Sequence, residues 1–274
     1  MPELPEVETV CRELNHQLKN KTLKTVNIKQ NTLRYSIPLK LQTIFIEKKV
    51  LSVNRRGKYG LIKFFGKFTL LFHLGMSGRV KIFKNFDNSY EKHDHLEFIF
   101  NDGIRLVYND PRRFGLVDIL ETKKVSQHFL LSKLGPEPLE ETFTVKFLEK
   151  KLISSNLDIK TFIMNQKIIA GIGNIYACEA LFMAKISPKR KAVNVVGIRA
   201  ERLVSSIKKV LKDAIKAGGS SLKDYRQVSG ELGYFQNKFL VYGRHNQHCV
   251  KCNNFINRIQ QNKRSTYFCG FCQR

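Results

Sequence analysis

Apolar residues recur with helical spacing near the start of the chain. From residue 7 to residue 18 they stand three or four positions apart, which predicts an amphipathic helix with one buried face. The residues that share this spacing are Val7, Val10, Cys11, Leu14 and Leu18. Pro5 opens the pattern, and Cys11 is expected to fill the core beneath the helix.

The spacing changes to short β-rich runs between Leu23 and about Leu120. Asn101-Asp102-Gly103 separates the last two runs and is a hairpin turn signal. Short strands at regular spacing predict an antiparallel sandwich or barrel. The clearest runs are Thr43–Ile46, Gly60–Phe65, Phe68–Phe72, Val80–Phe83, Leu96–Phe100 and Ile104–Tyr108.

Helical spacing returns after a linker at residues 134–138. One helix is expected from Phe147 and another over Ile159–Ile163. A long amphipathic helix is expected between Leu203 and Ile215, and the glycine pair at residues 218 and 219 is expected to stop it.

The last part of the chain differs again in composition. Residues 217–237 are rich in Gly and Ser and have few apolar positions, so they are expected to form a loop. A cysteine-containing tail begins at Val241. Together these patterns predict an α+β protein with parts at 1–132, 133–240 and 241–274.

The charge of the chain indicates a polyanionic partner. Its 274 residues are enough for two domains, and 48 Lys and Arg against 23 Asp and Glu give a net charge of +25. A generally basic surface and an anionic membrane are the alternatives. Because no apolar run approaches about 18 residues and no signal peptide opens the chain, we expect a soluble intracellular protein that binds no membrane.

Four of the six cysteines form a metal-site pattern. Cys249 and Cys252 are followed, after 16 residues, by Cys269 and Cys272. Two CxxC pairs at this separation predict a tetrahedral zinc site, and four thiolates would close the coordination sphere of a structural ion. The basic residues between the pairs predict a hairpin that presents Arg264 to a phosphate; a solvated basic turn is the alternative.

The first six residues, MPELPE, suggest a reaction in which an N-terminal amine is the nucleophile. Removal of Met1 would leave Pro2 with a free secondary amine, and α-amino groups have a pKa of about 7.7–8.0. Such an amine attacks an aldehyde-like carbon to give an iminium ion, and Glu3 next to it could move protons. The plainer alternative is a stiff, exposed N-terminus in which the glutamate caps a helix.

Several short motifs are each ambiguous. GIGN at residues 171–174 indicates either a phosphate site at a helix N-terminus around Asn174, with Lys160 nearby, or a tight turn. RRGKYG at residues 55–60 places Lys58 on a turn, where it could reach a phosphate or an active-site oxygen; a solvated turn is the alternative. HLGMSG at residues 73–78 and DPRRFG at residues 110–115 carry bulky residues that either wedge between base pairs or belong to the core. The bulky apolar residues are Met76 and Phe114, and Arg112 could fill the space of a missing base; the three are called the wedge residues below.

Together these pieces resemble the bacterial formamidopyrimidine-DNA glycosylase family. MPELPEVET, RRGKYG, HLGMSG, DPRRFG, AGIGNIYACE, AGGSSLKDY, VYGR and the CxxC pairs occur in the family's order across the whole chain. The resemblance implies an N-terminal helix and antiparallel β-sandwich as the catalytic domain (1–132). It also implies a helix–two-turn–helix domain (133–240) with a lesion-capping loop at 217–237, and a four-cysteine zinc finger (241–274).

The resemblance also implies the site residues. Pro2 would be the nucleophile, Glu3 the proton donor and acceptor with Glu6 as a supporting carboxylate, and Lys58 the proton donor in strand cleavage. Catalytic residues would be Pro2, Glu3, Lys58 and Arg264, the last through a phosphate contact. DNA contacts would come from Met76, Arg112, Phe114, Lys160 and Asn174. One structural Zn2+ would be held by Cys249, Cys252, Cys269 and Cys272.

The implied activity is a glycosylase and AP lyase that removes oxidised purines from double-stranded DNA. It would act on oxidised bases or abasic sites as a monomer in the bacterial cytoplasm, associated with the nucleoid. An endonuclease VIII-type enzyme for oxidised pyrimidines, a non-catalytic DNA-binding protein on this scaffold and an RNA-binding zinc ribbon are the alternatives. Leu4 favours the purine branch, because the endonuclease VIII group typically begins MPEGPE. Asn253 and Lys263 depart from the family, which usually has Gly in these finger positions.

Overall fold

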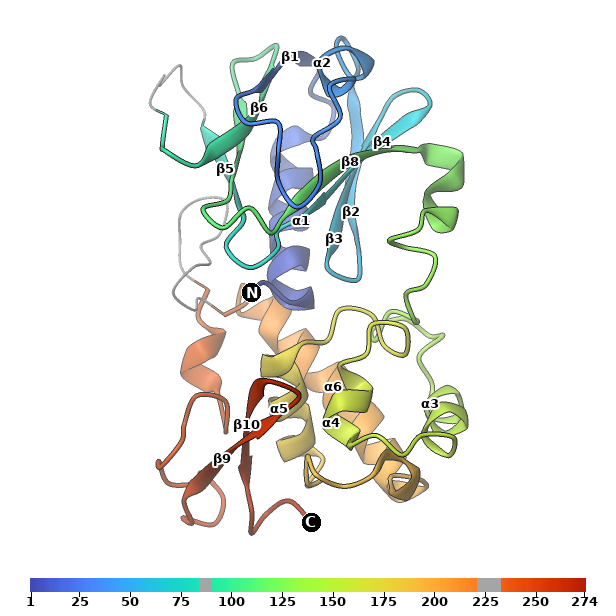
Figure 1. Cartoon of the computed structure of the whole chain (residues 1–274), viewed down its shortest axis with the longest axis vertical. Helices are drawn as coiled ribbons and strands as arrows, with labels where there is room; N and C mark the ends of the chain where they lie inside the picture. The colour runs from blue at the N-terminus through green and yellow to red at the C-terminus, as the bar shows by residue number, and fades with distance from the viewer. Residues whose placement is uncertain (84–89, 221–232) are drawn as a thin grey trace. The chain divides into compact units, whose positions relative to one another are not determined.

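The structure is a computed structural model that describes residues 1–83, 90–220 and 233–274. The chain forms two compact units (Figure 1). One unit comprises Met1–Ser132 and Ala217–Tyr234, and the other comprises Lys133–Lys216 and Phe235–Arg274. In the described part of the chain, no helix is both long enough and apolar enough to cross a membrane.

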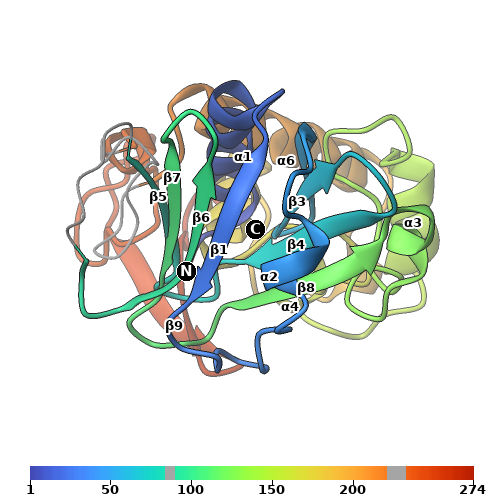
Figure 2. The ribbon, with the colours of Figure 1, turned by 90° about the horizontal axis from the view of Figure 1, so that it is seen from above.

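The first unit consists of helix α1 (Leu4–Leu18) and two four-stranded antiparallel sheets, which face each other in Figure 2. One sheet has the order β1-β6-β7-β5 and the other β2-β3-β4-β8, and α1 packs against β2 and β3. The strands are β1 (Leu23–Ile28), β2 (Val50–Arg56), β3 (Tyr59–Phe64), β4 (Phe68–His73), β5 (Arg79–Phe83), β6 (Asp94–Phe100), β7 (Arg105–Asn109) and β8 (Leu116–Glu121). This is the sandwich that the β-rich runs predict.

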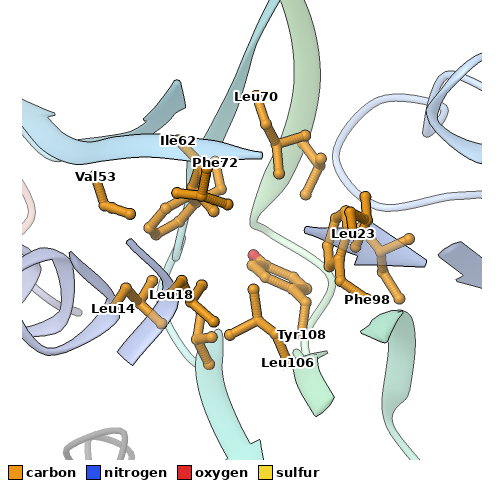
Figure 3. Close-up of a cluster of buried hydrophobic side chains, with 14 of the residues drawn as sticks. Leu14, Leu18, Leu23, Val53, Ile62, Leu70, Phe72, Phe98, Leu106 and Tyr108 are labelled. Atoms are coloured by element: carbon orange, nitrogen blue, oxygen red, sulfur yellow. The ribbon is translucent and has the colours of Figure 1, made fainter. Parts of the chain in front are cut away.

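The core of this unit lies between the sheets and α1. In Figure 3, Leu14 and Leu18 of α1 point toward Phe72 of one sheet, and Phe98 and Tyr108 line the other side. All five apolar positions of the predicted helical stripe are buried, and the predicted helix is confirmed. Burial also raises the pKa of the Cys11 thiol to about 12, as expected for an unreactive core residue.

The predicted strand at Thr43–Ile46 is wrong. Leu41–Ile44 form the short helix α2 instead. Leu41 and Phe45 are both buried, and their spacing of four places them on one helical face, where Phe45 packs on Phe64 at 4.4 Å between ring centroids. The β-branched residues in this segment favoured a strand by composition, but packing of these two apolar side chains decides the local structure.

The other predicted strands and the hairpin turn are confirmed, with boundaries shifted by one or two residues. Gly103 has a φ of 84° and connects the antiparallel strands β6 and β7. The 3-10 segment η1 (Thr122–Gln127) follows β8.

The second unit contains four α-helices and a terminal β-hairpin among its described residues (Figure 1). Helix α5 is buried almost throughout and packs against α6 and against strand β10. The elements are α3 (Val145–Leu152), α4 (Ile159–Ile163), α5 (Asn174–Met183), η2 (Ala192–Asn194), α6 (Ile198–Lys216), η3 (Phe235–Lys238), β9 (Ile256–Gln261) and β10 (Arg264–Cys269). The helices predicted from periodicity are confirmed.

The predicted loop at 217–237 lies partly outside the described residues, which omit 221–232. Gly218 and Gly219 follow α6 with φ values of 74° and 80°, a conformation that glycine adopts at little cost and that ends the helix. Ser220 forms an isolated antiparallel bridge with Tyr234, so the two described ends of this segment lie side by side.

Leu14→Ala is expected to destabilise the protein by about 2–5 kcal/mol, because it leaves a cavity among fully buried neighbours. The matched control Leu39→Ala removes a side chain that is 66% exposed and should change stability by less than about 0.5 kcal/mol. Urea unfolding followed by circular dichroism measures both. Equal effects of the two substitutions would contradict the packing described for α1.

Candidate active site

The N-terminal turn is buried in the first unit. Pro2 is buried and Glu3 is only 3% exposed, directly ahead of α1. The backbone N–H of Glu3 donates to Oε2 of Glu6 at 2.8 Å, and the N–H of Val7 donates to the carbonyl oxygen of Glu3 at 3.1 Å. Residues 2 and 3 are therefore not the exposed start that the plainer alternative expects. Its other part is confirmed, because Glu3 is the N-cap of α1 and forms a capping box with Glu6.

The Glu6 carboxylate also binds a segment distant in sequence. Its Oε1 accepts hydrogen bonds from the backbone N–H of Ser220 at 2.8 Å and from the Ser220 hydroxyl at 3.0 Å. Gly219 lies so close that a Cβ there would come within 3.1 Å of the same oxygen. Glu6, 1% exposed, thus holds both the N-terminal turn and the start of the segment after α6.

Lys58 lies in the turn between β2 and β3 and is 8% exposed. The positive charge of Lys58 acts on the imidazole of His73, at the end of β4. Burial first, and then the positive charges of Lys58 and Arg34, together lower the pKa of His73 to about 4. Nδ1 of His73 accepts a hydrogen bond from the Gly75 N–H at 3.0 Å, so the neutral ring carries its proton on Nε2. The imidazole is therefore neutral at neutral pH and lies within range of the charge of Lys58.

The buried carboxylate of Asp110 accepts hydrogen bonds from both the HLGMSG and the DPRRFG loop. Asp110 is fully buried and accepts from the Ser77 hydroxyl at 2.6 Å and from the Gly115 N–H at 2.8 Å. Gly75 has a φ of +60°, and a Cβ on it would lie 2.5 Å from the Gly115 nitrogen, so these loops touch through their backbones. Sequence reasoning missed Asp110 and Ser77, although both stand inside the motifs.

This contact brings the three predicted wedge residues onto adjoining loops. Phe114 is 47% exposed, Met76 is half-buried and Arg112 is exposed. The Arg112 guanidinium stacks over the Phe114 ring at 4.9 Å. An exposed aromatic ring and a planar cation on a rigid loop suit contact with unpaired or unstacked bases. The alternative that Phe114 belongs to the core is excluded by its exposure.

In the second unit, three predicted residues gather at the hairpin. Asn174 is the first residue of α5, and its Nδ2 donates to the carbonyl oxygen of Ser265 at 2.9 Å. Lys160 is 1% exposed, and its Nζ donates to the Thr266 hydroxyl at 2.6 Å. Arg264 is exposed at the first position of β10. The structure therefore places Lys160 inside the unit and Arg264 at its surface.

The two positions that depart from the family adopt a conformation that favours glycine. Lys263 has a φ of 60° and, with Asn262 at 47°, makes the two-residue turn between β9 and β10. Asn253, after the first CxxC pair, has a φ of 62°. The hairpin therefore keeps its turn without glycine at either position.

The four predicted metal ligands lie together. All four sulfur atoms are within 4.8 Å of one another, with Cys249 and Cys272 at 3.9 Å and Cys252 and Cys269 at 3.4 Å. Tetrahedral ligands about 2.3 Å from an ion stand about 3.8 Å apart, so the cluster fits a four-thiolate metal site. All four are free thiols, and the exposed side chains of His245 and His248 are not in the cluster.

A buried carboxylate that sequence reasoning missed fixes the segment before the first metal ligand. Glu179 in α5 is 1% exposed and accepts from three successive backbone N–H groups, those of Leu240, Val241 and Tyr242, at 2.8–3.0 Å. Burial raises the pKa of this carboxyl, and the three donors oppose that rise. Its signal in the sequence is a single acid within an otherwise apolar helix.

Comparison with known proteins gives full-length similarity to one family. The family description "Formamidopyrimidine-DNA glycosylase N-terminal domain" matches residues 1–117, and "Formamidopyrimidine-DNA glycosylase H2TH domain" matches residues 134–226. Proteins named formamidopyrimidine-DNA glycosylase from Dinoroseobacter shibae and Wolbachia pipientis wMel are 46% and 45% identical, each over 100% of both chains.

Solved structures show the same similarity. A complex of a Lactococcus lactis FPG mutant with DNA that contains Fapy-dG has a TM-score of 0.93 and 36% identity, covering 100% of both chains. A MutM complex with DNA that contains carbocyclic 8-oxo-G has a TM-score of 0.92 and 37% identity, again over 100% of both chains. A complex of L. lactis Fpg with abasic-site DNA has a TM-score of 0.92 and covers 99% of each chain.

Lys58→Met is expected to raise the pKa of His73 above about 4, because one of the positive charges that lower it is removed, while burial keeps it below 6.5. NMR titration of the histidine ring, assigned with His73→Gln, measures this shift. Lys24→Met, at an exposed position of β1, is the matched control and should leave the value unchanged. An unchanged His73 pKa in Lys58→Met would show that the charge of Lys58 does not act on this ring.

Proposed function

This chain belongs to the formamidopyrimidine-DNA glycosylase family, and on that premise we propose that it excises oxidised purines through the amine of Pro2 and then cleaves the strand. The observation that carries the proposal is the buried N-terminal turn, in which Pro2 is buried and the backbone N–H of Glu3 donates to the carboxylate of Glu6. The solved relatives that hold DNA with Fapy-dG, an 8-oxo-G analogue or an abasic site support the substrate class.

The chemistry begins with removal of Met1, which makes the Pro2 nitrogen a secondary amine. With a pKa of about 7.7–8.0, a sizeable fraction of such amines is neutral near pH 7. The amine attacks C1′ of the damaged nucleotide, and the C1′–N bond breaks with its electron pair going to the base. The C1′–O4′ bond then breaks as the amine nitrogen forms a double bond to C1′, and Glu3 moves the protons, one of them to O4′. The resulting iminium ion has no nitrogen proton to lose, so it stays an electron sink for β- and then δ-elimination.

Lys58 supplies the next proton in this proposal. Lys58 is buried and its charge acts on His73, whose ring is neutral at neutral pH, so the two groups do not repel each other as charges. We assign it the role of proton donor during strand cleavage, as the family resemblance implies.

The wedge residues would fill the space of the flipped base. Extruding a base costs a few kcal/mol of unstacking, and the rigid contact between their two loops keeps these side chains in place to offset that cost. Arg264 and Asn174 would contact phosphates, a sequence-independent interaction that the charge of +25 also favours. The wedge residues are Met76, Arg112 and Phe114.

Four thiolates are the ligand set of structural zinc sites, and we propose Zn2+ at the cysteine cluster, where it would hold the hairpin and take no part in the reaction. The proposed parts are a catalytic domain at 1–132, a helix–two-turn–helix domain at 133–240 and a finger at 241–274. We further propose that the enzyme works as a monomer on double-stranded DNA in the bacterial cytoplasm.

A lesion panel tests the proposed activity. Duplexes with 8-oxoguanine, a formamidopyrimidine, thymine glycol or no lesion are incubated with excess enzyme, and base release and strand cleavage are followed separately. The purine lesions should be released fastest and intact duplex should not be cut. Faster release of thymine glycol would instead indicate a glycosylase for oxidised pyrimidines. If no base were released from any duplex, the proposed glycosylase activity would be contradicted.

Pro2→Gly tests the nucleophile within the same assay. It leaves a primary amine after Met1 removal and should slow base release while DNA binding is retained. A form with Met1 retained, verified by intact mass, is the matched control and should be inactive because its residue-2 nitrogen is an amide. Full activity of the Met1-retained form would contradict the assignment of Pro2.

A further inference from the structure

Lys160 is directed into the second unit, toward strand β10. Its side chain is 1% exposed, and its Nζ lies 2.6 Å from the hydroxyl of the fully buried Thr266 and 3.4 Å from the carbonyl oxygen of Ser265. Burying an ammonium is costly unless hydrogen bonds replace its hydration. The lysine therefore stabilises this stretch of β10, and its Nζ is not displayed at the surface where a DNA backbone passes.

The same stretch of β10 is held from other directions. The carbonyl oxygen of Ser265 also accepts from Nδ2 of Asn174 at 2.9 Å, and the Ser265 hydroxyl accepts from Nε of Arg258 on the neighbouring strand at 3.1 Å. Ser265 is thus fixed through both its backbone and its side chain. It directly follows Arg264, so these contacts set where the arginine backbone lies.

The tip of the hairpin is attached to the region around α4 as well. Nε2 of Gln261 donates to Asp158 at 3.3 Å, and Nδ2 of Asn262 donates to the Thr161 hydroxyl at 2.6 Å. Residues 158, 160 and 161 therefore hold the hairpin on both sides of its turn. Arg264 stands between these contacts and is itself exposed.

We propose that Lys160 is a positioning residue that acts on DNA through Arg264 and does not itself contact a phosphate. The proposal rests on the proposed function, because it requires Arg264 to bind the DNA backbone. It predicts that removing Lys160 weakens DNA binding only while Arg264 is present. If Lys160 contacted a phosphate directly, its removal would weaken DNA binding in the absence of Arg264 as well.

The test measures binding to a duplex that contains an abasic-site analogue at several salt concentrations. Arg264→Ala and Lys160→Met should each weaken binding about tenfold, and each should lower the slope of log affinity against log salt by roughly 1. The double variant Lys160→Met/Arg264→Ala should bind no more weakly than Arg264→Ala alone. Lys151→Gln, an exposed charge removal on α3, is the matched control and should give the same change in both backgrounds.

An additive double variant, with a further tenfold loss and a further slope change of about 1, would overturn the proposal in favour of a direct phosphate contact. No change in binding on Arg264→Ala would point instead to a failure of the proposed function, because the phosphate contact itself would be missing. These two outcomes are distinct.

A second pair of variants covers the case in which Lys160→Met does not fold or loses its metal. Thr266→Val removes the acceptor of the lysine hydrogen bond at nearly constant volume, whereas Thr266→Ser keeps the hydroxyl. The valine variant should reproduce the loss of salt slope seen in Arg264→Ala, and the serine variant should behave as the unmodified protein. An unchanged salt slope in Thr266→Val would overturn the proposal.

Discussion

The carboxylate of Glu6 is the contact on which the N-terminal site depends. It is buried and accepts hydrogen bonds from Glu3 on one side and from Ser220, 214 positions later in the chain, on the other. A buried carboxylate is tolerated only when such donors replace water. The same requirement keeps Glu3 and the start of the segment after α6 at a fixed separation within one unit.

Other buried polar groups also hold segments of the chain in place through hydrogen bonds. Asp110 joins the HLGMSG and DPRRFG loops, Glu179 holds the segment before Cys249, and Lys160 holds the strand that begins at Arg264. The exposed residues that these groups support are the ones expected to meet DNA. The surplus of positive charge supplies affinity for any duplex, whereas the buried contacts determine where each exposed side chain stands.

The parts predicted from sequence are those set by local spacing. The α1 stripe, most strands and the cysteine quartet follow from short-range periodicity, and the structure has them. Thr43–Ile46 was mispredicted as a strand because tertiary packing of Phe45 overrides β-propensity. The direction of Lys160 and the partners of Glu179 depend on residues about 60 to 106 positions away, which periodicity does not reveal.

Borohydride trapping with peptide mapping tests the role of the N-terminal amine most directly. Enzyme whose Met1 has been removed is incubated with a duplex that contains an oxidised purine, reduced, digested and analysed by mass spectrometry. The expected result is a covalent sugar adduct on the nitrogen of Pro2. An adduct on a lysine side chain such as Lys58, or base release with no adduct at all, would contradict the assignment of Pro2 as nucleophile.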